Sequence, residues 1–271
     1  MLALSATDWP PRLAILAGGL ATRLRPLTNA TPKSLIPVAG EPFLAHLLRH
    51  LRSQGLREIV LCCGYLGEQI EAFAGDGRRF GVRLLYSHDG DQPLGTGGAV
   101  RAALPLLGRR FLVMYGDSWL NEPIQPVWQA FAACRKPALM TVFQNRNRWG
   151  ASNVEFRRGA VIRYDKENPR AAMHHIDYGL EAMDASVLEY WIRQSFDLSE
   201  VWSALADYSL LAGFETRDRF YEIGSLFGLQ ETEAAIAARR DVSPLSGHGA
   251  APLPLAATRP GPLDGSGEAL L

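Results

Sequence analysis

The stretch Leu13-Ala-Ile-Leu-Ala-Gly-Gly19 runs a short apolar segment directly into two glycines. A parallel strand that is buried on both faces typically has such a continuous apolar sequence. Glycines after the strand let the backbone approach a ligand closely, and successive N–H groups in such a loop can surround phosphate oxygens. The stretch therefore predicts the first strand of an α/β sheet followed by a phosphate-binding loop, although a plain strand-to-helix turn is the simpler alternative.

Helical and strand patterns alternate through the first half of the chain. Leucines recur on one helical face between Pro42 and Gly55, and the next apolar run, 58–63, predicts a strand. Further helices are expected at 66–74, 98–107 and 124–134, with strands at 82–86, 111–115 and 139–143. Because such alternation is typical of crossover connections, we expect an α/β fold with a Rossmann-like, doubly wound, mostly parallel sheet.

The pattern changes after Gly150. Two short strand patterns at 153–156 and 160–164 flank a turn at 157–159, which indicates a hairpin, and 176–183 predicts another strand. Helices are expected at 197–205 and 231–239, with short strands at 210–214 and 220–223. We expect this half to add a small β lobe. From 243 to 271 the chain is dominated by Pro, Gly, Ala and Leu without a sustained period, which predicts a disordered tail.

Composition excludes several classes of function. The 28 basic residues are balanced by 28 acidic ones, which argues against a nucleic-acid partner bound by a broad positive field. Three cysteines, Cys62, Cys63 and Cys134, are too few for a disulfide framework or a zinc site. No apolar run approaches the roughly 20 residues of a membrane span, and no signal peptide is evident. We expect a cytoplasmic protein without a membrane partner and leave a homo-oligomer open.

A carboxylate follows the strand predicted at 111–115. The segment Met114-Tyr-Gly-Asp117 places it just beyond the carboxyl end, where ligands gather in open α/β sheets. Mg²⁺ prefers oxygen ligands and usually takes one or two protein carboxylates beside substrate phosphates. The alternative is an aspartate that caps a turn or helix. We interpret Asp117 as a candidate Mg²⁺ ligand.

The glycine loop carries a longer motif. The chain from Leu16 to Thr28, followed by Pro32-Lys33, resembles the signature G-G-x-G-T-R-L-x-P-L-T and P-K of the sugar-nucleotide pyrophosphorylases, or sugar-1-phosphate nucleotidyltransferases. The chain has Ala21 where that signature has glycine. The resemblance extends from about Leu13 to Ala238. It implies a nucleotide-diphospho-sugar transferase fold over residues 1–242, with about 13–150 as the nucleotide half and about 151–242 as the sugar-facing half.

The resemblance also implies an activity and roles for residues. The activity is transfer of a nucleoside monophosphate from an NTP to a sugar 1-phosphate, with release of pyrophosphate and Mg²⁺ as cofactor. The implied catalytic residues are Arg23 and Lys33 at the triphosphate and Lys166 at the sugar phosphate. The implied contacts are Ala17, Gly18, Gly19, Gln92 and Gly97 for the nucleotide, Asp165, Lys166 and Gly179 for the sugar, and Asp117 and Glu222 for the metal.

Substrate identity is the finer expectation. Segments such as Gly75-Asp-Gly77 and Tyr221-Glu-Ile-Gly224 most resemble bacterial enzymes that act on D-glycero-D-manno-heptose 1-phosphate, which implies GTP as the donor. Uridylyl, thymidylyl or cytidylyl transfer to another sugar phosphate remains an alternative. A non-catalytic nucleotide sensor is another, because Ala21 and Glu222 depart from the family pattern. A glycosyltransferase is disfavoured, since its Asp-x-Asp metal signature is absent around Asp117.

Overall fold

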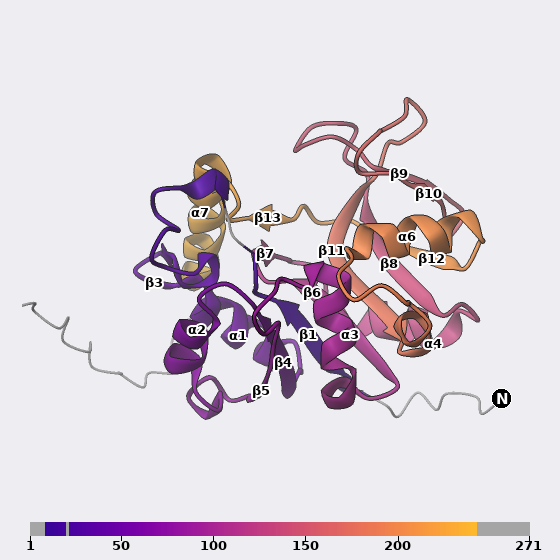
Figure 1. The fold of residues 1–271 in the computed structure, drawn as a ribbon. Helices are drawn as coiled ribbons and strands as arrows, with labels where there is room; N and C mark the ends of the chain where they lie inside the picture. Colours follow the sequence, from indigo (N-terminus) through magenta and orange to yellow (C-terminus); the bar gives the residue numbers. More distant parts are fainter. Residues whose placement is uncertain (1–8, 20–21, 243–271) are drawn as a thin grey trace, which may run out of the picture.

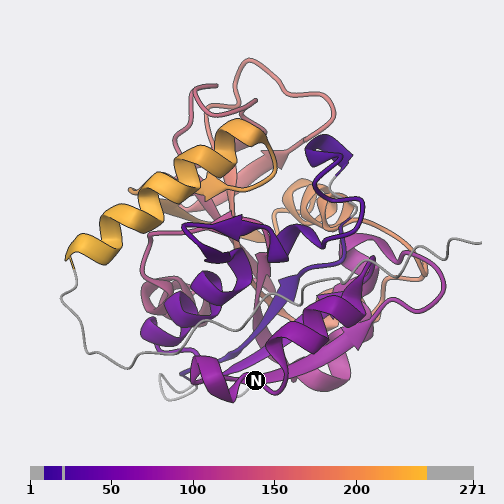
Figure 2. The ribbon, with the colours of Figure 1, turned by 90° about the vertical axis from the view of Figure 1, so that its left-hand side faces the viewer.

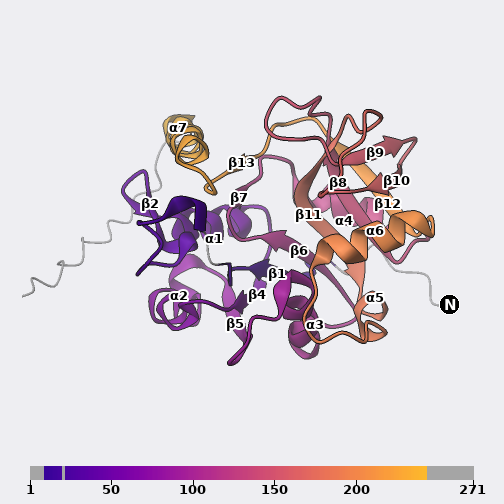
Figure 3. The ribbon, with the colours of Figure 1, turned by 45° about the horizontal axis from the view of Figure 1, so that its top comes forward.

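A nine-stranded mixed sheet forms the centre of the computed structural model, which describes residues 9–19 and 22–242. The strand order is β5-β4-β1-β6-β11-β8-β12-β10-β9, and Figure 3 shows it crossing the molecule from β5 to β9. The strands are β1 (Arg12–Leu16), β4 (Glu58–Cys63), β5 (Arg83–His88), β6 (Arg110–Tyr115), β8 (Ala138–Phe143), β9 (Val154–Arg157), β10 (Ala160–Tyr164), β11 (Ile176–Asp184) and β12 (Leu211–Thr216). Only β11 and β10 run against the others among these strands. The predicted α/β class with a mostly parallel sheet is confirmed.

Helices cover both faces of this sheet (Figure 1). One face packs against α1 (Phe43–Ser53), α2 (Gly67–Ala74) and α4 (Ile124–Ala133), and the other against α3 (Gly95–Leu107), α5 (Ser186–Glu189) and α6 (Leu198–Asp207). Alternate residues of β1 supply the two cores, since Leu13 and Ile15 lie in the first and Ala14 in the second. This two-sided burial is why the strand reads as an unbroken apolar run.

Two short sheets stand beyond the main one. In one of them β2 (Pro37–Val38) pairs with β3 (Glu41–Pro42), and in the other β7 (Ser118–Trp119) pairs with β13 (Tyr221–Glu222). Figure 2 shows α7 (Leu226–Val242) passing beside the segment that carries β2 and β3. There the Ala39 N–H donates to Glu233 Oε1 at 2.8 Å. The remaining helical segments are the 3-10 turns η1 (Thr22–Leu24), η2 (Lys33–Leu35) and η3 (Arg78–Phe80).

Three local differences from the sequence expectation have physical reasons. The hairpin expected after Gly150 is present, and β10 also pairs with β12 at Ala160 and Ala212, so the hairpin is joined to the edge of the main sheet. Helix α3 begins three residues earlier than expected, at Gly95, because a tertiary contact of Thr96 holds its first turn. Helix α7 begins at Leu226, since the Ser225 hydroxyl accepts the N–H of Gly228 in its first turn and the Glu222 carboxylate holds the N–H of Gly224 just before it.

In the part of the chain that the structure covers, no helix combines the length and apolar character needed to cross a membrane. The expected tail, 243–271, lies outside the described residues, as does Ala21 of the loop.

Candidate functional site

A cavity of about 330 Å³ opens at the carboxyl ends of β1, β4 and β6. The loop residues Ala17, Gly18 and Gly19 line it after β1, and Asp117 lines it after β6. A side chain at Gly18 would not fit, because a Cβ atom there would lie 2.7 Å from the backbone nitrogen of Gly64. Parallel strands end at one edge of the sheet, and this is why segments far apart in sequence meet here.

An ion pair occupies the floor of the cavity. Lys33, the first residue of η2, places Nζ 2.5 Å from Oδ2 of Asp117. The Ser118 hydroxyl donates to the other carboxylate oxygen of Asp117 at 3.4 Å. The Lys33 and Asp117 side chains remain 17% and 32% exposed, so both can still reach a bound ligand. The structure thus brings together the cation predicted for the triphosphate and the carboxylate predicted for the metal.

Pairing of β13 with β7 brings Glu222 to the same place. Glu222 lies opposite Ser118 in this pair, and the N–H of Ile223 donates to the backbone oxygen of Asp117 at 3.0 Å. The Glu222 carboxylate accepts hydrogen bonds from the Gly224 N–H at 2.5 Å and from the Ser225 hydroxyl at 3.1 Å. Glu222 therefore neighbours Asp117 and also ties the turn that starts α7.

The two carboxylates suit a hard divalent cation. Mg²⁺ commonly takes one or two protein carboxylates and completes its shell with water and substrate phosphates. Within residues 9–19 and 22–242, no group of three or more His, Cys, Asp or Glu side chains is arranged to hold a metal. Asp117 and Glu222 lie on or beside two paired strands, and an ion held there would take its remaining oxygen ligands from water or a phosphorylated substrate. Their metal-binding role stays a prediction.

Two helix N-termini meet at the cavity wall. Thr96, in the first turn of α3, donates to Asp197 Oδ1 from both its backbone N–H and its hydroxyl, each at 3.0 Å. Asp197 also begins α6 in a capping box with Glu200. Both Thr96 and Asp197 line the cavity. The Asp-x-x-Glu spacing marks the start of α6 in the sequence, but nothing in it reveals a partner 101 residues away.

The two residues predicted to read the base, Gln92 and Gly97, differ in their surroundings. Gln92 is exposed and does not line the cavity, whereas Gly97 is buried and its N–H donates to the backbone oxygen of Phe196 at 2.9 Å. From the same region the structure brings Asp89 and Thr96 to the cavity instead. Burial raises the pKa of Asp89 above its ordinary value. The base-reading roles of Gln92 and Gly97 stay predictions.

Arg23, Asp165, Lys166 and Gly179 do not line the cavity. Arg23, on η1, and Lys166, after β10, are exposed. Oδ1 of Asp165 accepts the N–H groups of Glu167 and Asn168 at 3.2 and 2.8 Å, so this carboxylate shapes the Lys166 loop. Gly179 adopts a φ of +93° at an irregularity of β11, where an added Cβ atom would lie 3.3 Å from the Ser118 hydroxyl. Gly179 is thus close to the Asp117 segment.

A thiol also faces the cavity. Cys62, at the end of β4, lines it and is 1% exposed. Burial raises the pKa of Cys62 to about 12. Because only the thiolate is strongly nucleophilic, this group is inert at neutral pH.

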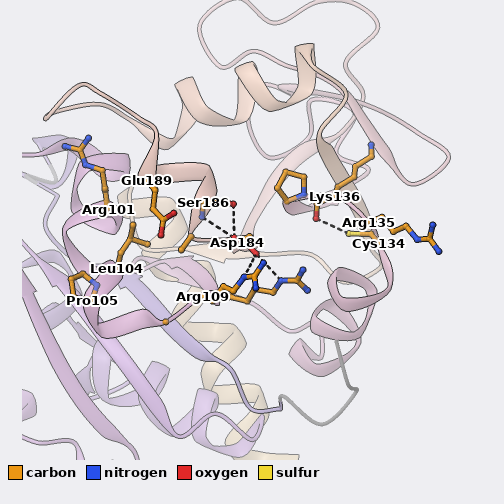
Figure 4. Close-up of a pocket in the computed structure, with 14 residues that line it drawn as sticks. Arg101, Leu104, Pro105, Arg109, Cys134, Arg135, Lys136, Asp184, Ser186 and Glu189 are labelled. Carbon is orange, nitrogen blue, oxygen red and sulfur yellow. Dashed lines mark hydrogen bonds and ion pairs between the residues drawn. The ribbon is translucent and has the colours of Figure 1, made fainter. Parts of the chain in front are cut away.

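A second, larger cavity of about 980 Å³ lies at the opposite edge of the sheet, where β6 and β8 begin (Figure 4). Four of its basic side chains have partners: Arg109 and Arg110 contact Asp184, Arg101 donates to main-chain oxygens, and Lys136 donates to the Leu211 oxygen at 3.2 Å. Figure 4 shows the Arg135 and Lys136 side chains extending away from Asp184. Arg109 and Arg110 converge on Asp184, which already pairs with both, while Arg135 and Lys136 extend away from it, so this cavity lacks the polar focus of the first.

Known proteins with similar sequences are nucleotidyltransferases. The family described as nucleotidyl transferase matches residues 13–170. The N-acetylmuramate alpha-1-phosphate uridylyltransferase of Neisseria meningitidis serogroup B is 47% identical over 104 residues, which is 38% of this chain and 45% of that protein. The mannose-1-phosphate guanylyltransferase catalytic subunit beta of Drosophila pseudoobscura pseudoobscura is 30% identical over 221 residues, 79% of this chain and 59% of that protein. The chain thus spans about half the length of these curated relatives.

A solved structure shares the fold. HddC from Yersinia pseudotuberculosis complexed with GMP-PN superposes with a TM-score of 0.70 at 21% identity, covering 83% of this chain and 99% of that one. At this identity the likeness concerns the fold alone.

Proposed function

This chain belongs to the nucleotidyl transferase family, and from that membership we propose that it transfers a nucleoside monophosphate from an NTP to a sugar 1-phosphate. The observation that carries the proposal is the Lys33–Asp117 pair beside the glycine loop, at the carboxyl edge of the sheet. Backbone N–H groups, an ammonium group and a carboxylate able to hold Mg²⁺ are the groups that a triphosphate requires.

The reaction needs no covalent protein intermediate. A phosphate oxygen of the sugar 1-phosphate attacks the α-phosphorus of the NTP, the bond to the bridging oxygen breaks, and pyrophosphate leaves in line. Catalysis of this kind depends on positioning two polyanions and neutralising their charge. Mg²⁺, when bound, supplies positive charge at the reacting phosphates. The inert state of Cys62 agrees with a mechanism that uses no thiolate.

The chain's own residues divide these tasks. Lys33 and Arg23 neutralise the triphosphate and the leaving pyrophosphate, while Lys166 holds the sugar phosphate. Asp117 and Glu222 hold Mg²⁺. Lys33 is already held at the cavity by Asp117, so its ammonium group is in position to contact a triphosphate bound at the glycine loop. Arg23 and Lys166 are exposed in the described structure, so solvent and a dissolved ligand can reach both side chains.

For the donor and acceptor we propose GTP and a heptose 1-phosphate, on the strength of the sequence segments named above. The known relatives differ in both respects, since their names specify uridylyl or guanylyl transfer and N-acetylmuramate or mannose phosphates. Uridylyl, thymidylyl or cytidylyl transfer is the alternative for the base. A cytoplasmic setting and a homo-oligomer remain predictions.

Pyrophosphate release measured over a matrix of four NTPs and several sugar 1-phosphates, with Mg²⁺ present, tests the proposal. Release that requires both substrates supports it, and the best pair identifies base and sugar. A nucleotide sensor binds NTP but releases no pyrophosphate. A glycosyltransferase consumes the finished sugar nucleotide instead. Thermal shift adds binding information, because a ligand at about 100 times its dissociation constant stabilises a protein by about 2.7 kcal/mol.

A further inference from the structure

Strand β11 buries a carboxyl group that the proposed reaction does not use. Glu181 is 0% exposed and lies between Val113 of β6 and Met140 of β8, facing the core beneath α6. Among the described residues, no N–H or other O–H group donates to either of its oxygen atoms. A buried carboxylate without donors or a cation is costly, because nothing replaces the lost water.

Asp177 is the polar neighbour of Glu181 on the same strand. On β8, Asp177 pairs with Val142 and Glu181 with Met140, only two residues away, because β11 is irregular between them. The irregularity therefore brings the two carboxyl groups together on one face of the sheet, where they interact directly. Asp177 is held from both sides: its Oδ1 accepts the Gly179 N–H at 3.0 Å, and its own N–H donates to Asn153 Oδ1 at 3.0 Å. These contacts span the irregularity of β11 in which Gly179 takes its positive φ.

Two carboxyl groups can share a hydrogen bond only if one of them carries a proton. The other titratable groups around the pair are Tyr115 of β6, Tyr164 of β10 and Lys166 beyond β10. The single cation of this set, Lys166, acts on Asp177. Asp177 also accepts a hydrogen bond from the Gly179 N–H, whereas Glu181 has neither a nearby cation nor an N–H donor among the described residues.

The proton therefore belongs on Glu181. Burial, and then the charge of Asp177, raise the pKa of Glu181 well above its ordinary value. Burial acts on the pKa of Asp177 in the same direction, but there the hydrogen bonds from Glu181 and Gly179 oppose it.

We propose that Glu181 is a protonated acid that donates its O–H to Asp177 and so fixes the turn in which Gly179 lies against Tyr115 and Ser118. Glu181 is then a positioning residue. Through Asp177 it sets where Gly179 stands relative to the Asp117 segment, and hence the shape of the sugar-phosphate side. This last step rests on the proposed function, whereas the proton and the turn do not.

Thermal melting against pH tests the proton directly, by comparing the wild type with Glu181→Gln. In the unfolded chain Glu181 loses its proton near its ordinary pKa of 4.5, while in the folded protein it keeps the proton to higher pH. The folded state then binds more protons, so wild-type stability falls relative to the glutamine variant as pH rises above that value. The melting temperature of Glu181→Gln minus that of the wild type should therefore increase between about pH 5 and about pH 9.

The exposed Glu189, beside the second cavity, supplies the matched control. The difference in melting temperature between Glu189→Gln and the wild type should stay constant over the same pH range. If instead the melting temperature of Glu181→Gln minus that of the wild type stays constant or decreases over this range, Glu181 is ionised in the folded protein. That result would overturn the proposal. This readout needs no substrate, so it stands or falls independently of the nucleotidyltransferase assignment.

Steady-state kinetics test the positioning role. Glu181→Gln keeps a donor toward Asp177 and should retain a near wild-type KM for the sugar 1-phosphate. Glu181→Leu removes the donor and should raise that KM by about ten-fold or more, with little change in the KM for NTP. Equal effects of the two variants, or a larger effect on NTP, would contradict a role on the sugar side. If the leucine variant does not fold, Glu181→Ala takes its place in the kinetic comparison, and the melting profile of Glu181→Gln still tests the proton.

Discussion

Lys33 and Asp117, 84 residues apart in sequence, form an ion pair with Nζ 2.5 Å from Oδ2 at the floor of the candidate site. Its distance and charge make it a charge-assisted hydrogen bond, and both side chains are held in place before a ligand arrives. A triphosphate and Mg²⁺ would each engage one member of the pair. The pair thus links the predicted phosphate and metal sites.

Removing the Asp117 carboxylate should abolish Mg²⁺-dependent turnover without unfolding the protein. We expect Asp117→Ala to lower kcat by roughly 100-fold or more, because positioned charge at a reacting centre has effects of this size. Its partly exposed side chain leaves no buried cavity, so the melting temperature should change little. The exposed Asp207 at the end of α6 gives the control, Asp207→Ala. Normal Mg²⁺-dependent turnover in Asp117→Ala would remove the metal assignment.

Lys166 should act on the sugar phosphate and not on the nucleotide. Loss of a hydrogen bond to a charged group typically costs about 1.5 to 3 kcal/mol, so Lys166→Ala should lower kcat/KM for the sugar 1-phosphate by roughly ten-fold to a hundred-fold. The affinity for NTP, measured alone, should change little. Arg23→Ala should show the opposite bias. If Lys166→Ala weakens NTP binding and spares the sugar phosphate, its assigned role is wrong.

Glu222 should have two separable roles, because its carboxylate ties the start of α7 beside the metal position. Glu222→Gln keeps an oxygen that can accept the Gly224 N–H, so it should nearly preserve the melting temperature but raise the Mg²⁺ concentration needed for half activation. Glu222→Ala loses both bonds and should also lower stability by about 1 to 3 kcal/mol. Mg²⁺ titration and urea unfolding distinguish the two. Unchanged Mg²⁺ dependence in the glutamine variant would leave Glu222 a purely structural residue.

Two glycines should respond differently to alanine. A Cβ atom at Gly97 would strike the Phe196 ring, so Gly97→Ala should destabilise the protein by about 1 to 3 kcal/mol through overpacking. At Gly19 an added Cβ atom meets nothing within 4 Å, so Gly19→Ala should keep the melting temperature. If the Gly19 backbone approaches the nucleotide, that variant should still raise the KM for NTP. A stable Gly97→Ala protein would show that the Phe196 contact yields easily.

The sequence predicts the nucleotide half of the fold well because its strands are buried on both faces. β4 falls where its apolar run places it, and β1 starts one residue earlier than expected. The proximity of Lys33 and Asp117 could be anticipated, since the family resemblance assigns both residues to one site for the triphosphate and its metal. The Thr96–Asp197 and Glu181–Asp177 contacts could not. The first contact joins the starts of two helices that are far apart in sequence. The second depends on an irregularity of β11 that leaves no recognisable trace in the hydrophobic pattern of the sequence. The burial of Gly97 was hidden too, because Phe196 comes from a loop 99 residues later.

The fate of the individual phosphates tests the central claim most directly. In one reaction the NTP carries a label on its α-phosphate, and in a parallel reaction on its γ-phosphate, with the preferred sugar 1-phosphate and Mg²⁺ present. The account predicts that the α label enters the sugar nucleotide and the γ label leaves in pyrophosphate, with neither event in Asp117→Ala. Transfer of the γ label to the sugar, or its release as inorganic phosphate without a sugar nucleotide, would contradict it.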